Sequence, residues 1–194
     1  MQDKTDSFYA DMQRYIAVTT VGPSALRNQG RPGVIETARR FLSALDIRTL
    51  AVNDEKSFLA VLDTTTAKLR QRLPLDSQHW GAARKALNLF LREICYNRFL
   101  SHRYSLALLE PWMEIPLDSL VAAALKSHVG RGGLPNWAGL KGLTPPVSLR
   151  FQHAAKDWAD AEVISRVHLD MRIWVKQRTK LANKALHRTA GSRR

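Results

Sequence analysis

The 194-residue sequence has a single cysteine, Cys95, and its longest clean apolar run spans only 120–125. One cysteine excludes an intramolecular disulfide, and such a run is far short of the about 20 apolar residues that a membrane span needs. Residues 1–6 are polar and acidic with no apolar run behind them, which is not the pattern of a secretory signal. These absences predict a cytoplasmic protein in a reducing compartment, with no membrane partner.

The sequence also lacks the spacings that mark common metal and catalytic sites. None of its six histidines pairs with another histidine or with Cys95 at metal-ligand spacing, so no metal site is predicted. No serine lies in a nucleophile elbow, and no P-loop with a Gly-Lys-Ser/Thr ending occurs. We therefore predict no cofactor, and the sequence leaves open whether the protein is an enzyme.

What the sequence has in excess is positive charge. The net charge is +13, from 30 lysines and arginines against 17 acids, and such an excess commonly serves phosphate backbones. Seven of these cations lie between Lys176 and Arg194, where there is no acid, and they leave +6 for the first 175 residues. The alternative is that the charge only keeps the protein soluble.

The hydrophobic spacing is helical almost everywhere, and no alternating pattern of useful length appears. We expect helices near residues 8–16, 32–45, 54–73, 77–100, 118–129 and 144–158, and a seventh from about 165 into the tail. Asp54 and Asp118 are expected N-caps, and Gly130 is an expected helix stop. Short strands at 50–52 and 163–164 are the alternative. The predicted fold is all-α: a single compact bundle of about seven helices over residues 1–178, with a flexible basic tail over 179–194.

The clearest helical pattern runs from about Ser77 to Leu100 and has a polar face opposite its apolar stripe. On the polar face Arg84, Asn88 and Arg92 follow one another at i, i+4 and i+8, with Lys85 beside them. This face suits phosphate contacts along a nucleic-acid groove. The alternative is a solvated outer face of an amphipathic helix.

The segment from Gly130 to Gly142 contains five of the ten glycines, with Arg131, Trp137 and Lys141 among them. Glycines allow several backbone N–H groups to converge on an anion, and the two cations would neutralise it. Trp137 would then stack on a base. The alternative is a plain connector with Trp137 in the core. The predicted nucleic-acid site thus consists of Arg84, Lys85, Asn88, Arg92, Arg131, Trp137 and Lys141, with DNA favoured over RNA as the partner.

Two short segments resemble helix-hairpin-helix DNA glycosylases. Leu134-Pro135 followed by Gly139-Leu140-Lys141 resembles the family hairpin, Leu-Pro-Gly-Val-Gly-x-Lys, and residues 167–174 are similar to the segment Val-Pro-Val-Asp-Val-His-Met-Trp that carries the catalytic aspartate. The resemblance implies a Schiff-base role for Lys141 and a catalytic role for Asp170, in cleavage of the N-glycosidic bond of an extruded base. This sequence departs from the family in having Asn136 at the first hairpin glycine, one extra hairpin residue and a longer gap from Lys141 to Asp170.

The tail carries a second resemblance. Residues 183–190, Asn-Lys-Ala-Leu-His-Arg-Thr-Ala, look like the translated recombination site of an integron gene cassette. The resemblance is confined to the tail and implies a mobile gene whose last codons were shaped by DNA recombination.

The sequence therefore predicts a basic helical nucleic-acid-binding protein from a mobile cassette. One alternative is a base-excision or nuclease-like enzyme that uses Asp170, with Lys141 or His168 nearby. Another is a partner-binding defence or antitoxin-like accessory protein. The oligomeric state is left open.

Overall fold

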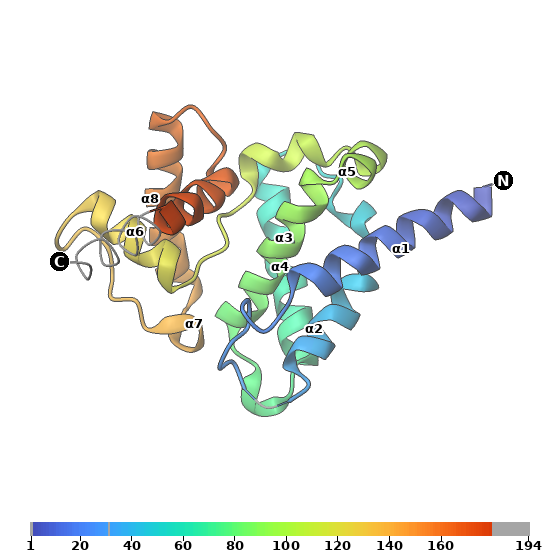
Figure 1. Ribbon diagram of the computed structural model, residues 1–194, viewed down its shortest axis with the longest axis horizontal. Helices are drawn as coiled ribbons and strands as arrows, with labels where there is room; N and C mark the ends of the chain where they lie inside the picture. The colour runs from blue at the N-terminus through green and yellow to red at the C-terminus, as the bar shows by residue number, and fades with distance from the viewer. Residues whose placement is uncertain (1, 31, 180–194) are drawn as a thin grey trace, which may run out of the picture.

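Helices form all the regular structure in the part of the chain that the computed structural model describes, residues 2–30 and 32–179 (Figure 1). The α-helices are α1 (Gln2–Thr20), α2 (Val34–Ser43), α3 (Glu55–Arg72), α4 (Trp80–Tyr96), α5 (Arg98–Tyr104), α6 (Ser119–Val129), α7 (Gly139–Gly142) and α8 (Pro145–Ala161). The 3₁₀ helices are η1 (Ile47–Leu50), η2 (Leu75–Ser77), η3 (Leu106–Trp112) and η4 (Arg166–His168). Residues 169–179 are again helical. No helix within the described ranges is both long enough and apolar enough to span a bilayer.

The all-α prediction is confirmed for the described residues, whereas the expected count of about seven helices is not. The helix expected over 77–100 ends at Tyr96, because the Asn97 side chain accepts hydrogen bonds from the N–H groups of Phe99 and Leu100 and so begins α5. The short helix α7 was not expected either. The predicted tail, 179–194, lies outside the described residues except for Thr179.

The two predicted aspartate caps are both present. The Asp54 carboxylate accepts from the N–H of Ser57 at 2.9 Å and begins α3, and Asp118 accepts from the N–H groups of Leu120 and Val121, each at 2.9 Å, and begins α6. Gly130, with φ of 91°, ends α6 as its position predicted.

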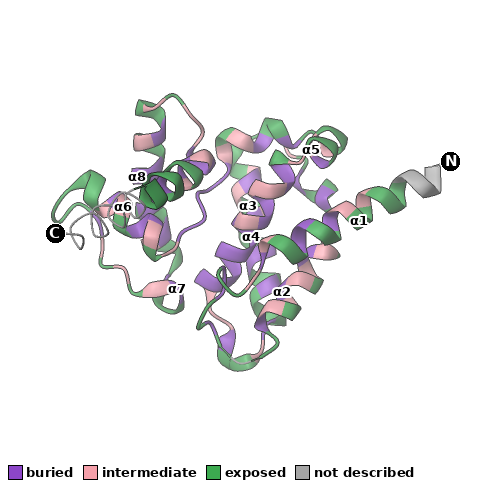
Figure 2. Cartoon of the chain, viewed as in Figure 1, coloured by how far each residue is buried: buried purple, intermediate pink, exposed green. Residues whose placement is uncertain are grey.

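The buried apolar side chains form two clusters rather than one. The first cluster includes Phe58, Leu87 and Phe90, and its residues come from the first five α-helices, α1 through α5, and from η3. The second includes Leu125 and Phe151 and joins α6, α7, α8 and residues 169–173. Figure 1 shows these two groups of helices side by side. Figure 2 shows that α4, which belongs to the first group and contacts α7 of the second, is buried along most of its length. The predicted single bundle therefore has two cores.

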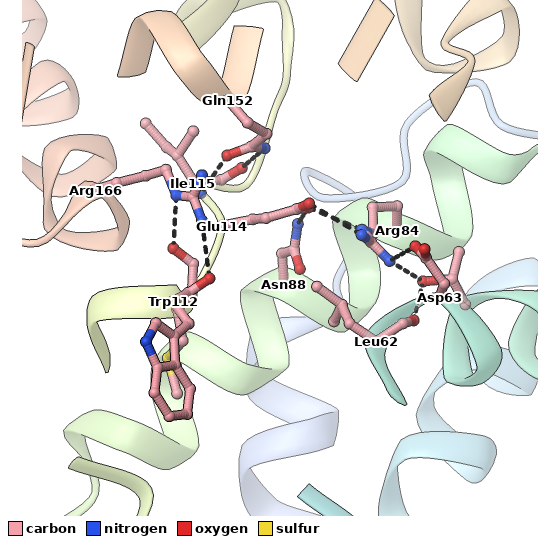
Figure 3. Close-up of polar contacts among 11 residues, drawn as sticks. Leu62, Asp63, Arg84, Asn88, Trp112, Glu114, Ile115, Gln152 and Arg166 are labelled. Carbon is pink, nitrogen blue, oxygen red and sulfur yellow. Dashed lines mark hydrogen bonds and ion pairs between the residues drawn. The ribbon is translucent and has the colours of Figure 1, made fainter. Parts of the chain in front are cut away.

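An extended segment, residues 113–118, runs between the two clusters and is buried from 113 to 117. The Gln152 amide pairs with both backbone groups of Ile115, at 3.0 and 2.9 Å. Arg166 donates to the carbonyls of Met113 at 3.0 Å and of Trp112 at 2.8 Å (Figure 3). Because buried peptide groups need partners, these two side chains replace the hydrogen bonds that a helix or sheet would supply.

Helices α4 and α7 approach one another at Gly81. A Cβ atom at this position would lie 2.4 Å from the carbonyl oxygen of Leu140 and 2.8 Å from Cβ of Leu143. Both distances are too short for packed atoms, so only glycine allows α7, the last part of the glycine-rich segment 130–142, to lie against α4.

The substitution Gly81→Ala is therefore expected to lower the free energy of unfolding by about 1–3 kcal/mol, the usual cost of an overpacked contact. Urea denaturation followed by circular dichroism measures the change. The matched control is Gly22→Ala, because a Cβ atom at Gly22 has no neighbour within 4 Å. Equal stability of the two variants would contradict a close contact at Gly81.

Candidate functional site

The polar face predicted on α4 lies inside the protein. Arg84, Lys85 and Asn88 have exposed fractions of only 5, 7 and 3%, and Arg92 is half-buried. Both sequence interpretations of this face, as phosphate contacts and as a solvated surface, were wrong for the first three residues. The reason is that acids distant in the sequence fold over the face and pair with its cations.

Arg84 is the centre of the buried polar network in Figure 3. Its guanidinium donates to both carboxylate oxygens of Glu114, at 2.8 and 2.9 Å, and also to the Thr66 hydroxyl at 2.9 Å. Asp63 lies 2.9 Å from the same guanidinium, and Asn88 donates to Glu114 at 2.9 Å. Burial alone would raise the pKa of Glu114, but the hydrogen bonds and charge of Arg84 outweigh it and hold that pKa below its ordinary value. The network ties α3 and α4 to the extended segment and has no cation left for a ligand.

Lys85 and Arg92 line instead a cleft of about 680 Å³ between α4, residues 19–25 and residues 170–174, here named the Asp170 cleft. Lys85 Nζ lies 3.2 Å from the Asp118 carboxylate. Arg92 is paired with Asp170 and also donates to Glu93, at 2.7 and 2.9 Å. An adjoining hollow of about 510 Å³ shares Lys85 and Asp118 with the cleft and continues to Gly139. The cleft lies where the two core clusters meet, which is a common place for a binding site.

The three residues predicted to be catalytic do not share the cleft. Asp170 lines it, and burial raises the pKa of that carboxyl to about 6 although the Arg92 charge opposes the shift. His168 lies beside it, with Nδ1 2.8 Å from the Tyr96 hydroxyl and Nε2 2.8 Å from Glu110. Lys141 is exposed on α7 and is not among the residues that line the cleft.

The glycine-rich segment is a surface connector with its tryptophan fixed to the body. Trp137 is half-buried, its indole N–H donates to the Ser119 hydroxyl at 3.2 Å, and its ring meets Phe151 edge-on with centroids 5.6 Å apart. Arg131 and Lys141 are exposed on either side of it. The structure therefore keeps the two predicted cations available and gives Trp137 mainly a packing contact.

Two further cations of this surface belong to no motif in the sequence. From 119 to 156 the sequence contains no aspartate or glutamate, but it has Lys126, Arg131, Lys141, Arg150 and Lys156. Arg150, on α8, donates to the carbonyl of Gly133 at 3.4 Å, which places it against the glycine-rich segment. Lys126 lies in the last turn of α6, just before that segment. A count of acids along the chain would have found this stretch.

No protein-family model matches this chain, and neither the curated proteins nor the solved structures include a significant match. The site must therefore be judged on its own chemistry. Among residues 2–30 and 32–179 no group of three or more histidine, cysteine, aspartate or glutamate side chains is placed to hold a metal ion. Burial raises the pKa of the Cys95 thiol to about 11, so its thiolate is scarce at neutral pH.

Proposed function

We propose that the protein binds nucleic acid, DNA first, through the surface formed by Lys126, Arg131, Lys141 and Arg150, here named the loop surface. The observation that carries the proposal is the 38-residue stretch 119–156 without an acid. None of the four cations forms an ion pair with another described residue, so their charge is available to phosphates. Lysine and arginine contacts to phosphates supply most of the affinity of such interfaces.

The internal ion pairs of α4 also bear on where the positive charge of the chain lies. The carboxylates of Glu93, Glu114, Asp118 and Asp170 all pair with cations of α4. Three cations, Arg84, Lys85 and Arg92, pair with these four acids, so the group is close to neutral and the positive charge of the chain lies on other residues. An exposed excess of this kind steers a polyanion toward the protein.

The glycines of the segment add a second source of attraction. Gly130, Gly132 and Gly139 all have positive φ, between 74 and 91°, a region that side chains disfavour. Without side chains at these positions a phosphate can approach the backbone N–H groups, between Arg131 at one end of the segment and Lys141 at the other.

The test compares full-length protein with a variant in which Lys126, Arg131, Lys141 and Arg150 are all replaced by glutamine. Binding to a fluorescein-labelled DNA duplex is measured by anisotropy over a series of salt concentrations. We expect the variant to bind about 100-fold or more weakly near 0.1 M salt, because each phosphate that the protein no longer neutralises lowers the slope of log K against log salt by about 0.9.

The matched control replaces four exposed cations elsewhere, Lys56, Lys68, Arg72 and Arg98, and so changes the net charge equally. It is expected to keep most of the affinity. If both variants lose affinity equally, the binding reflects net charge alone and the loop surface is not the site. If the unmodified protein shows no salt-dependent binding, the proposal fails.

A second candidate is base-excision or nuclease-like chemistry at Asp170, favoured by the burial of this carboxyl in a cleft and by its pKa of about 6. The position of Lys141 does not support a Schiff-base step with it. Any cleavage of bound DNA by the protein should disappear in Asp170→Asn while binding is retained. Cleavage that persists in this variant would exclude Asp170 as the catalytic group.

A further inference from the structure

The Asp170 cleft has an excess of carboxylates. Its charged groups come from three elements: Lys85, Arg92 and Glu93 from α4, Asp118 from the start of α6, and Asp170 from the last helix. These are two cations and three acids. The Asp118 carboxylate is fully engaged, since one oxygen caps α6 and the other faces Lys85.

Two carboxylate oxygens in the cleft lack a donor. Arg92 donates to Oδ2 of Asp170 and to Oε1 of Glu93, and no hydrogen bond from residues 2–30 or 32–179 reaches the other oxygen of either group. A ligand that fits these atoms must supply N–H or O–H donors.

The walls beside the free carboxylate oxygens are aromatic and apolar. Tyr96 and Trp174 line the cleft with 40 and 51% of their surface exposed, and Met171 lies beside them. The guanidinium of Arg178 already lies 5.2 Å from the centre of one Trp174 ring, so this indole is placed to interact with cations. Aromatic faces next to a carboxylate favour organic cations, which gain from both.

Other ligand classes fit less well. An anion would meet three carboxylates, and the two cations that line the cleft, Lys85 and Arg92, are already paired. A purely apolar molecule would remove water from the carboxylates and give no hydrogen bond in return. We infer that the Asp170 cleft binds a small organic amine, with its ammonium group at Asp170 and Glu93 and its apolar part against Trp174. This inference does not depend on nucleic-acid binding, since the loop surface takes no part in it.

The test titrates full-length protein with 2-phenylethylamine, and with 2-phenylethanol as the uncharged control of nearly the same shape, by isothermal calorimetry and ligand-detected NMR. We expect the amine to bind at least about tenfold more tightly than the alcohol at pH 7.5, because only the amine carries a positive charge to pair with the carboxylates. The affinity for the amine should fall as the pH drops below about 6, where Asp170 becomes protonated.

Two variants locate the site. Glu93→Gln removes one charge but keeps an acceptor for Arg92, and Trp174→Leu removes the exposed indole. Both variants are expected to fold and to bind the amine at least about fivefold more weakly. Glu55→Gln, an exposed change in the first turn of α3, is the matched control and should bind normally. Equal binding of amine and alcohol, no binding of the amine, or normal binding by both cleft variants would each overturn the inference.

Discussion

Replacing Glu114 with alanine is expected to lower the free energy of unfolding by about 3–5 kcal/mol, the usual effect of removing one partner of a buried ion pair. Arg84 would lose both hydrogen bonds to the carboxylate, and Asn88 would lose its acceptor. Asp63, the other acid near Arg84, has a side chain that is 66% exposed, so it cannot replace a buried partner. Urea denaturation followed by circular dichroism measures the loss.

Two controls separate this effect from a generic loss of charge. Asp11→Ala breaks an exposed ion pair with Arg14 and should cost less than about 1 kcal/mol. The double variant Arg84→Met with Glu114→Leu should recover most of the stability, because it removes both buried charges and keeps the volume. A loss below about 1 kcal/mol for Glu114→Ala would show that the network is not a buried link between the two cores.

For Asp170 we expect the opposite effect: removing this carboxylate should raise the free energy of unfolding at neutral pH. Burial raises the folded-state pKa of this carboxyl from 3.8 to about 6, so between these values the folded protein holds a proton that the unfolded chain has released. The contribution of Asp170 to the free energy of unfolding therefore decreases as the pH rises from about 4 to about 6, by about 3 kcal/mol for a shift of about two pKa units. Asp170→Asn removes this titration.

We accordingly expect Asp170→Asn to gain stability relative to the unmodified protein across this window and to be the more stable of the two at pH 7. The measurement is the difference in free energy of unfolding between the two proteins, taken from urea denaturation at several pH values. Asp157→Asn, an exposed change on α8, is the control for the loss of one carboxylate. If Asp170→Asn is instead the less stable protein at pH 7 and the gap closes on acidification, the attraction of Arg92 outweighs the burial of Asp170.

Local sequence signals predicted several of the helix ends, although not the number of helices. Asp54, Asp118 and Gly130 act within one turn of their own position, so their effect on the backbone can be read without knowledge of the fold. The end of α4 at Tyr96 is also set locally, since the Asn97 side chain caps α5, and the prediction of one helix over 77–100 missed this cap. The apolar stripe of α4 was also correct, since Leu87, Phe90 and Ile94 are fully buried.

The environment of the polar face of α4 could not be predicted in this way. A helical repeat of arginine, asparagine and arginine is the same whether water, phosphate or carboxylate faces it. The partners of Arg84 and Arg92 are Glu114, 30 residues away, and Asp170, 78 residues away. Only the tertiary fold brings these acids to α4, and the Asp170 cleft is a product of the same long-range contacts.

The loop surface, rather than the C-terminal tail, is proposed to bind nucleic acid. The slope of the logarithm of the association constant K for DNA against the logarithm of the salt concentration tests this most directly. Full-length protein is compared with the loop-surface variant and with a tail variant in which Lys180, Lys184, Arg188, Arg193 and Arg194 become glutamine. We predict that the slope falls by about 0.9 for each phosphate that the loop-surface variant no longer neutralises, and that the tail variant keeps most of the slope. A slope that collapses in the tail variant and is unchanged in the loop-surface variant would contradict this assignment.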